Sequence, residues 1–358
     1  MPGALHLRGP VLVGPQDVRD EMWVVDGRVT FTQPHVDTHT IEGWVLPGLV
    51  DAHCHIGLGR DGAVDAMTSE QQAQTDRDAG TLLIRDAGSP VDTRWIDDRE
   101  DLPRIIRAGR HIARTRRYLR NYAYEVEPED VVDYVRQEAR RGDGWVKLVG
   151  DWIDRDKGDL APSFPRETVI AAVAAAHEEG ARTTAHCFGE ESLRDFAAAG
   201  TDCIEHASGL EPDTMGAFAE HDIAIVPTLV NIANLPLLAG PAEGKFPAFH
   251  AHMLDLHRRR YDTIAAAHDA GIRIYLGTDA GGGLPHGLVA QEAGELIKAG
   301  LSPTEVLYAA CWGAREWLGR PGLQEGESAD LVVYSEDPRN DLAVLAAPTA
   351  VVLRGRLV

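Results

Sequence analysis

Two histidines separated by one residue are the first residues of this chain whose spacing suggests a chemical role. His53 and His55 end an apolar segment that follows a Pro47-Gly48 turn, and such a segment predicts a buried strand. Side chains at positions i and i+2 of a strand point to the same face. Two imidazoles could therefore bind one metal ion, whereas the alternative is a pair of exposed or hydrogen-bonded histidines.

Further ligand-type residues lie within or at the ends of other apolar segments: Lys147, His186, His206 and Asp279. Each has an ordinary explanation when taken alone, such as a core histidine or a turn aspartate. Lys147 is the least ordinary, because a buried ammonium costs several kcal/mol unless it is paired or neutralised.

Eight predicted strands alternate with helical segments, and this pattern is typical of a parallel sheet. The strands are expected at residues 45–53, 81–86, 104–107, 145–149, 182–186, 203–206, 224–228 and 272–277. Eight βα units favour a closed (β/α)8 TIM barrel, in which functional residues collect at the carboxyl ends of the strands. A doubly wound open sheet is the alternative, but its usual Gly-rich first turn is replaced here by histidines.

The two ends of the chain have a different pattern, with short apolar segments separated by turns. Asp26-Gly27 between two such segments indicates a hairpin. Neither end has enough apolar residues to form a core alone. We therefore expect residues 1–45 and 325–358 to form one composite β-sandwich domain, and residues 46–324 to form the barrel.

Composition excludes several classes of protein. The 358 residues carry a formal net charge of −21, which argues against binding to nucleic acid or to an anionic membrane. The four cysteines form no close pair, and no segment has the length and composition of a membrane span, so a cytoplasmic protein is expected. The expected partner is a small-molecule substrate, and the oligomeric state, including a homo-oligomer, stays open.

As a set, these motifs resemble the amidohydrolase superfamily, and within it Xaa-Pro dipeptidases, arginine carboxypeptidases and imidazolonepropionase-like proteins. The matching segments are residues 47–55, 84–88, 145–147, 184–186, 204–206, 226–229, 277–279, 285–287 and 329–333. The resemblance extends over nearly the whole chain, and it implies the same barrel with a terminal β-sandwich.

The resemblance also implies a binuclear metal centre. One metal ion would be bound by His53, His55 and Asp279, and a second by His186 and His206. A carboxylated Lys147 would bridge the two ions, because a bridging ligand must be anionic. Zinc suits this ligand set. A hydroxide held between the ions would attack the substrate carbonyl, with Asp279 transferring the proton to the leaving group.

One loop departs from the relatives, which often have a Gly-Gly-His turn after the third strand. The segment 110–124 is instead rich in arginine, and Arg116 or Arg117 could bind a substrate carboxylate, or could form surface salt bridges. His286 is expected to contact substrate or to orient Asp279. The Pro-rich segment 231–247 is a candidate lid.

These observations predict a metal-dependent hydrolase that cleaves an amide-like C–N bond of a small molecule, such as a dipeptide or an N-acyl amino acid. Two alternatives stay open. The first is a mononuclear deaminase or cyclic-amide or lactone hydrolase of the same superfamily, which generally does not need Lys147. The second is a non-catalytic barrel scaffold, which would be expected to have lost some ligand residues.

Overall fold

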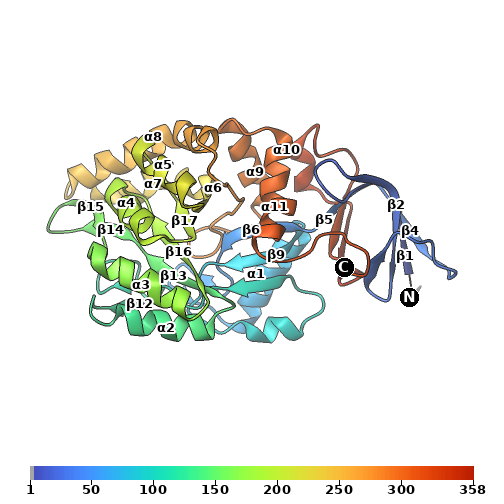
Figure 1. The fold of residues 1–358 in the computed structure, drawn as a ribbon, viewed down its shortest axis with the longest axis horizontal. Coiled ribbons are helices and arrows are strands. Elements are labelled where there is room, and N and C mark those ends of the chain that lie inside the picture. Colours follow the sequence, from blue (N-terminus) through green and yellow to red (C-terminus); the bar gives the residue numbers. More distant parts are fainter. Residues whose placement is uncertain (1–3) are drawn as a thin grey trace.

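The computed structural model describes residues 4–358, in which parallel strands alternate with helices (Figure 1). The first parallel sheet has the strand order β10-β9-β6 and includes the strand that carries His53. Its members are β6 (Leu49–Cys54), β9 (Thr81–Asp86) and β10 (Arg104–Arg107), with α1 (Ala66–Asp78) between β6 and β9. All residues of β6 and β9 are buried, as expected for parallel strands covered on both faces.

The second parallel sheet has the order β12-β11-β13-β16-β17-β18. Its strands are β11 (Ile112–Arg114), β12 (Tyr124–Val126), β13 (Trp145–Val149), β16 (Arg182–Cys187), β17 (Cys203–His206) and β18 (Ala224–Val226). The helices that connect them are α2 (Val131–Arg141), α3 (Arg166–Glu178), α4 (Glu190–Ala199) and α5 (Pro212–Glu220). The mixed α/β class with parallel strands is therefore confirmed.

The predicted strand at 272–277 is wrong as a regular strand. This segment makes only isolated parallel bridges, Ile225 with Ile274 and Cys54 with Ala280. The extended conformation ends at Asp279, whose φ of 59° lies in the left-handed region. The segment nevertheless runs between β18 and β6, since the backbone N–H of Ala52 donates to the carbonyl of Leu276 at 2.8 Å.

A single glycine allows this close approach. A Cβ on Gly277 would lie 2.7 Å from the backbone nitrogen of His53, so any larger residue would push the segment away from β6. On the other side, no ladder joins β10 to β13 among the described residues. A closed eight-stranded barrel therefore stays a prediction.

Strands from both ends of the chain form one eight-stranded sheet with the order β21-β20-β19-β5-β1-β2-β3 and with β4 paired to β1. It lies at one end of the molecule, beside the parallel strands (Figure 1). A two-layer sandwich and the exact domain boundaries stay predictions. The strands are β1 (Ala4–Leu12), β2 (Val18–Val25), β3 (Arg28–Thr30), β4 (His39–Glu42), β5 (Trp44–Pro47), β19 (Leu331–Tyr334), β20 (Ala350–Leu353) and β21 (Arg356–Leu357).

The remaining elements cover the parallel strands. Two short hairpins are formed by β7 (Leu58–Gly59) with β8 (Gly62–Ala63) and by β14 (Asp151–Asp154) with β15 (Asp159–Pro162). The candidate lid 231–247 contains the end of α6 and all of α7. The helices are α6 (Leu229–Ile232), α7 (Leu235–Ala239), α8 (Pro247–Asp269), α9 (Val289–Lys298), α10 (Pro303–Leu307) and α11 (Gly313–Trp317). Within residues 4–358, no helix is both long and apolar enough to cross a bilayer.

Candidate active site

Three of the predicted ligand residues meet at the carboxyl end of β6. Asp279 Oδ1 lies 2.9 Å from His53 Nε2 and 3.0 Å from His55 Nε2, and the two imidazole nitrogens are 3.2 Å apart. Both histidines are buried, with exposed fractions of 0% and 5%. Two nitrogens and a carboxylate oxygen that converge in a buried position make a donor set suited to a divalent metal ion.

The backbone around this group fixes the direction of each ligand. His55 Nδ1 contacts the carbonyl oxygen of Gly88 at 2.7 Å, which directs Nε2 toward Asp279. The backbone N–H of Asp279 donates to the carbonyl of His53 at 2.7 Å. Asp279 Oδ2 accepts a hydrogen bond from the Asn231 amide at 2.6 Å, so Oδ1 remains directed at the histidines.

His186 and His206 form a second group at the ends of β16 and β17. His206 Nε2 lies 2.8 Å from His186 Nδ1, and His206 Nδ1 lies 2.7 Å from the hydroxyl of Thr228. His186 Nε2 is buried without a hydrogen-bond partner. The rings of His206 and His53 are 5.5 Å apart, so the two groups are neighbours.

Burial sets the charge of this second pair. It lowers the pKa of His206 to about 3 and the pKa of His186 well below its usual value. Both rings are therefore neutral near pH 7, which is the form that binds metal ions.

Lys147 lies in the middle of β13 and is 1% exposed. Its ammonium forms an ion pair with Glu205, a fully buried residue of β17. Glu205 also contacts His53 Nδ1 at 3.2 Å and accepts a hydrogen bond from the Thr184 hydroxyl at 2.8 Å. Although burial opposes ionisation, the charges of His53 and Lys147 hold the pKa of Glu205 well below its usual range.

The two carboxylates also determine the charge of His53. Burial alone would lower the pKa of His53, but the charges of Glu205 and Asp279 outweigh this effect and raise it. The pKa of Asp279 is held well below its usual value, since the charge and hydrogen bonds of the histidines outweigh its burial. The site is therefore a compensated network of buried charges.

His286 contacts Asp76 rather than Asp279, and its contact with substrate stays a prediction. Its Nδ1 lies 2.8 Å from Asp76 Oδ2 of α1, and the pair belongs to a compact group with Cys54. Burial lowers the pKa of His286, but the charge of Asp76 outweighs it and raises the pKa. Within residues 4–358, no direct hydrogen bond joins His286 to Asp279, and Asn231 takes that place.

The two loop arginines have different environments. Arg117 is half-buried, and its guanidinium donates to Asp154 at 2.9 Å and to the carbonyl of Ala161 at 3.0 Å. It therefore attaches its loop to the β14–β15 hairpin. Arg116 is exposed and has a φ of 60°, and its backbone N–H donates to Glu125 at 3.0 Å.

Sequence reasoning missed four residues that line the site: Asn231, Glu205, His111 and Tyr118. The His111 ring stacks on His55 at 5.0 Å, and both of its nitrogens are buried without a partner. The Tyr118 ring lies 5.4 Å from that of His186. Both residues lie within the Arg-rich segment 110–124, and no local pattern in it marks them as site residues. Glu205 directly precedes His206 in the sequence, and the alternation of side chains along a strand predicts that the two point to opposite faces.

Comparison with known proteins identifies the class to which this fold and site belong. A sequence model of the amidohydrolase family matches residues 44–358, and the chain belongs to that family. An uncharacterized protein of Mycobacterium tuberculosis is 52% identical over 355 residues, which is 98% of this chain and 95% of the relative.

Two solved structures share the fold over nearly their full length. A putative prolidase from Bifidobacterium longum has a TM-score of 0.84 and 26% identity, covering 100% of this chain and 95% of its own. A Xaa-Pro dipeptidase with methionine bound in its active site has a TM-score of 0.84 and 22% identity, covering 99% of both chains. The predicted resemblance is therefore confirmed, and the chain is a hydrolase of the amidohydrolase family.

Proposed function

We propose that this protein is a metal-dependent hydrolase that cleaves an amide-like C–N bond of a small molecule, such as a dipeptide or an N-acyl amino acid. The proposal includes a closed (β/α)8 barrel with a β-sandwich built from both termini. The observation that carries it is the convergence of His53, His55 and Asp279 beside the neutral pair His186 and His206. The fold shared with a putative prolidase supports the choice of substrate class.

His53, His55 and Asp279 would hold one divalent ion, and His186 and His206 a second, with zinc as the expected metal. When bound, such ions supply Lewis-acid polarisation of a carbonyl and a water nucleophile at neutral pH. Two observations fit this role: His186 Nε2 is buried without a hydrogen-bond partner, and His53 Nε2 and His55 Nε2 converge on one oxygen of Asp279.

Asp279 would move the proton during the reaction. Its Oδ1 faces the histidines, and its Oδ2 is held by Asn231. A carboxylate in this position can accept a proton from attacking water and return it to the leaving nitrogen, so that one amide and one water give an acid and an amine. Burial raises the pKa of Tyr118 well above its usual value, so this neutral hydroxyl beside His186 would donate a hydrogen bond to a bound substrate.

Lys147 determines whether one or two ions are bound. Carboxylation would convert its ammonium to an anion and would break the ion pair with Glu205. Glu205 would retain Thr184, His53 and the Arg85 guanidinium at 3.9 Å, so it would not be left unpaired. The binuclear form is therefore compatible with this strand arrangement.

A mononuclear hydrolase or deaminase is the second candidate, in which Lys147 would keep its ion pair with Glu205. If Lys147 keeps its ammonium, it neutralises Glu205 and leaves only neutral histidines at the second position.

Metal content tests the two forms. We expect about two zinc ions per chain by mass spectrometry, as in two-metal hydrolase sites. Lys147→Ala should lower occupancy and activity together, and bicarbonate should promote reconstitution of the apo wild type. A screen of dipeptides, N-acyl amino acids, lactones and cyclic amides would identify the substrate class. One tightly bound ion with full activity in Lys147→Ala would favour the mononuclear enzyme.

A further inference from the structure

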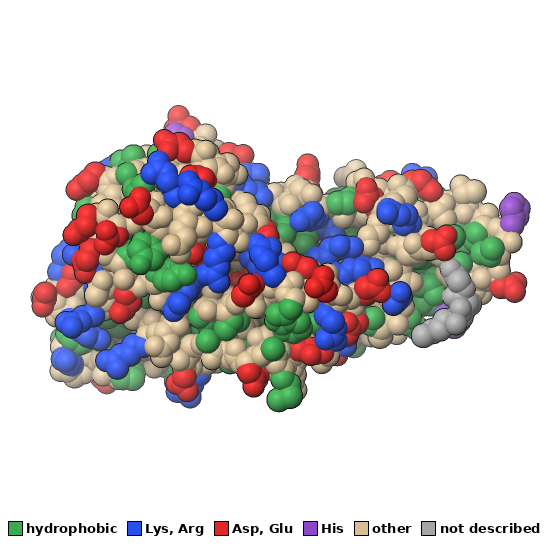
Figure 2. All heavy atoms as spheres, turned by 90° about the horizontal axis from the view of Figure 1, so that it is seen from below, with side chains coloured by type: hydrophobic (Ala, Val, Ile, Leu, Met, Phe, Trp, Pro, Cys, Tyr) green, Lys and Arg blue, Asp and Glu red, His purple; other side chains and the backbone are tan. Residues whose placement is uncertain are grey.

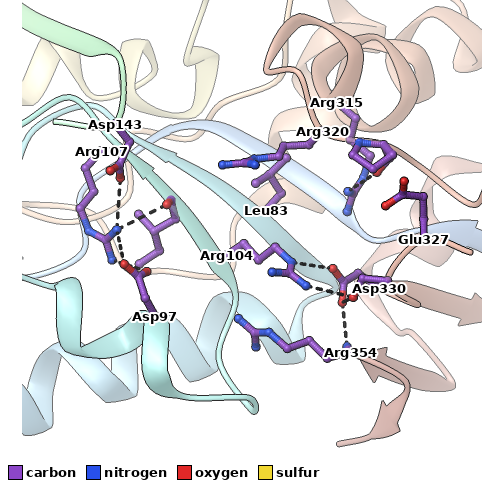
Figure 3. A pocket seen from close by; sticks show the side chains of 13 residues that line it. Leu83, Asp97, Arg104, Arg107, Asp143, Arg315, Arg320, Glu327, Asp330 and Arg354 are labelled. Carbon is purple, nitrogen blue, oxygen red and sulfur yellow. Dashed lines mark hydrogen bonds and ion pairs between the residues drawn. The ribbon is translucent and has the colours of Figure 1, made fainter. Parts of the chain in front are cut away.

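A pocket lined by arginines lies away from the metal ligands, where the parallel strands meet the terminal sheet (Figure 3). Its volume is about 430 Å³, within the range of small-ligand sites. Arg104 is the first residue of β10, and Arg315 binds the carbonyl of Gly48 immediately before β6. The pocket thus lies near the beginning of strands whose carboxyl ends carry the candidate active site.

Two of its arginines are neutralised by carboxylates. Arg104 Nε donates to Asp330 at 2.9 Å, and Arg107 contacts Asp97 at 2.9 Å and Asp143 at 3.2 Å. Figure 3 shows these pairs as two separate groups on opposite sides of the pocket. Arg94 also contacts Asp143 at 2.9 Å, so three arginines balance the three carboxylates and these groups form neutral walls of the pocket.

The guanidinium groups of three further arginines have no carboxylate partner among residues 4–358, although the backbone N–H of Arg354 donates to Asp330 at 2.7 Å. Arg315 is 5% exposed and donates only to the carbonyls of Gly48 and Pro321, at 2.8 to 3.1 Å. Arg354 donates to the carbonyls of Arg99 and Leu102, both at 3.0 Å.

Arg320 is exposed, and the described residues provide no partner for its guanidinium. Glu327 is the one lining carboxylate left outside the ion pairs of the described residues. Three cations face one anion, which is an excess of two positive charges in a chain whose net charge is −21.

Carbonyl dipoles alone compensate a buried guanidinium incompletely. Burial lowers the pKa of Arg315, and burial together with the charge of Arg104 lowers that of Arg354. An anion in the pocket would offset the free-energy cost of burying these positive charges. Guanidinium groups bind carboxylate and phosphate oxygens in a bidentate manner. On the surface, basic side chains gather across the middle of one face among acidic ones (Figure 2).

We propose that this pocket binds a small multivalent oxyanion, carrying phosphate or carboxylate groups, between Arg315, Arg320 and Arg354. The ligand must be small, because the pocket is bounded by the ion-paired walls. It would connect the segment after α11 to the turn between β20 and β21, and would stabilise the packing of the terminal sheet on the parallel strands. This site is independent of the proposed function.

The test is calorimetric titration of the full-length, metal-loaded protein with inorganic phosphate, pyrophosphate and succinate at constant ionic strength. We expect saturable binding and a higher Tm with at least one of these probes. Tighter binding of pyrophosphate than succinate would assign a phosphate ligand, and the reverse order would assign a dicarboxylate.

Two variants change the affinity in opposite directions. Arg320→Gln should weaken binding about tenfold or more, since it removes a charge-assisted contact. Glu327→Gln should strengthen binding severalfold, because it removes the remaining negative charge. Arg155→Gln is the matched control, since Arg155 is also exposed but lies on the β14–β15 hairpin. It should bind as wild type does.

The proposal is overturned if no probe raises the Tm beyond the matched chloride control. It is equally overturned if Arg320→Gln and wild type bind the probe with the same affinity, because the anion would then be bound elsewhere, the metal centre included.

Discussion

The two ends of the parallel strands use buried charge in opposite ways. At the carboxyl ends, His53, Lys147, Glu205 and Asp279 compensate one another within a few ångströms. Near the beginning of the strands, Arg315 is buried against carbonyl oxygens alone. A compensated network is preorganised for chemistry, since its charges need not rearrange. A group of cations without carboxylate partners is preorganised for binding.

The largest expected effect is at the carboxyl ends. Asp279→Asn removes the proton carrier while keeping its shape, and loss of a general acid-base group costs about 10²–10⁴ in rate. We expect kcat to fall by this factor, with some loss of metal because the same carboxylate is a ligand. The measurement is steady-state kinetics with metal analysis on the same sample.

Asp37→Asn is the matched control, since Asp37 is exposed on the terminal sheet side of the chain. A metal-replete Asp279→Asn variant with kcat within a few-fold of wild type would show that another residue carries the proton, and His286 would be the first to examine.

The next effect separates the two loop arginines. Arg116→Ala should lower kcat/KM about ten- to hundredfold for substrates with a free carboxylate, since a charge-assisted contact contributes about 1.5–3 kcal/mol. Amidated analogues of the same substrates should be little affected. The assay is a matched pair of substrates that differ only in this group.

Arg117→Ala should instead act through packing, because its guanidinium is committed to Asp154 and to carbonyls of the hairpin. We expect equal losses on both substrates and a fall of about 0.5–3 kcal/mol in the free energy of unfolding. A selective loss on the acidic substrate would make Arg117 the substrate contact and would contradict the packing role.

The two ends should also respond independently. Arg320→Gln should leave kcat/KM within about twofold of wild type, since sites far apart without shared partners are additive. Asp279→Asn should bind pyrophosphate with nearly wild-type affinity. A variant at one end that changed the measured property of the other would show that the terminal sheet and the metal site are coupled.

The smallest expected effect is on the pH dependence of the free energy of unfolding, through His252 of α8. Hydrogen bonds from the His252 ring to the carboxylates of Glu190 and Asp159 raise the pKa of His252 to about 9, although burial opposes this. A raised folded-state pKa means that the contribution to stability is complete below the unfolded pKa of 6.5 and is lost as pH rises through about 9.

His252→Gln should therefore lower the free energy of unfolding at about pH 6 more than at about pH 9.5. Since the histidine is partly exposed, the difference should be on the order of 1 kcal/mol. Urea unfolding at both pH values measures it. An equal loss at both would show that the interaction does not depend on the charge of His252.

Local sequence patterns predicted most of the strands that carry the candidate ligands. The buried strands around Lys147 and His206 follow from apolar segments of strand length and have the predicted bounds. The strand predicted at 45–53 is divided at Gly48 into β5, which joins the terminal sheet, and β6, which carries His53. The segment before Asp279 was harder to predict. Its close contact with β6 depends on Gly277 and on a left-handed residue, and a regular ladder does not form there.

The sequence by itself determined the parallel α/β class, the family and the ligand-type residues at the strand ends. All three are encoded in residue types and in spacings of a few residues. The tertiary structure decided the partners of these residues. In the folded chain, Lys147 forms an ion pair with Glu205, and Asp279 accepts a hydrogen bond from Asn231. His286 contacts Asp76, and Arg117 attaches its loop to a hairpin. Each partner is separated from its residue by 37 to 210 positions in the chain. Such pairs are set by the free energy of burying and compensating charge in the assembled core, which no local pattern records.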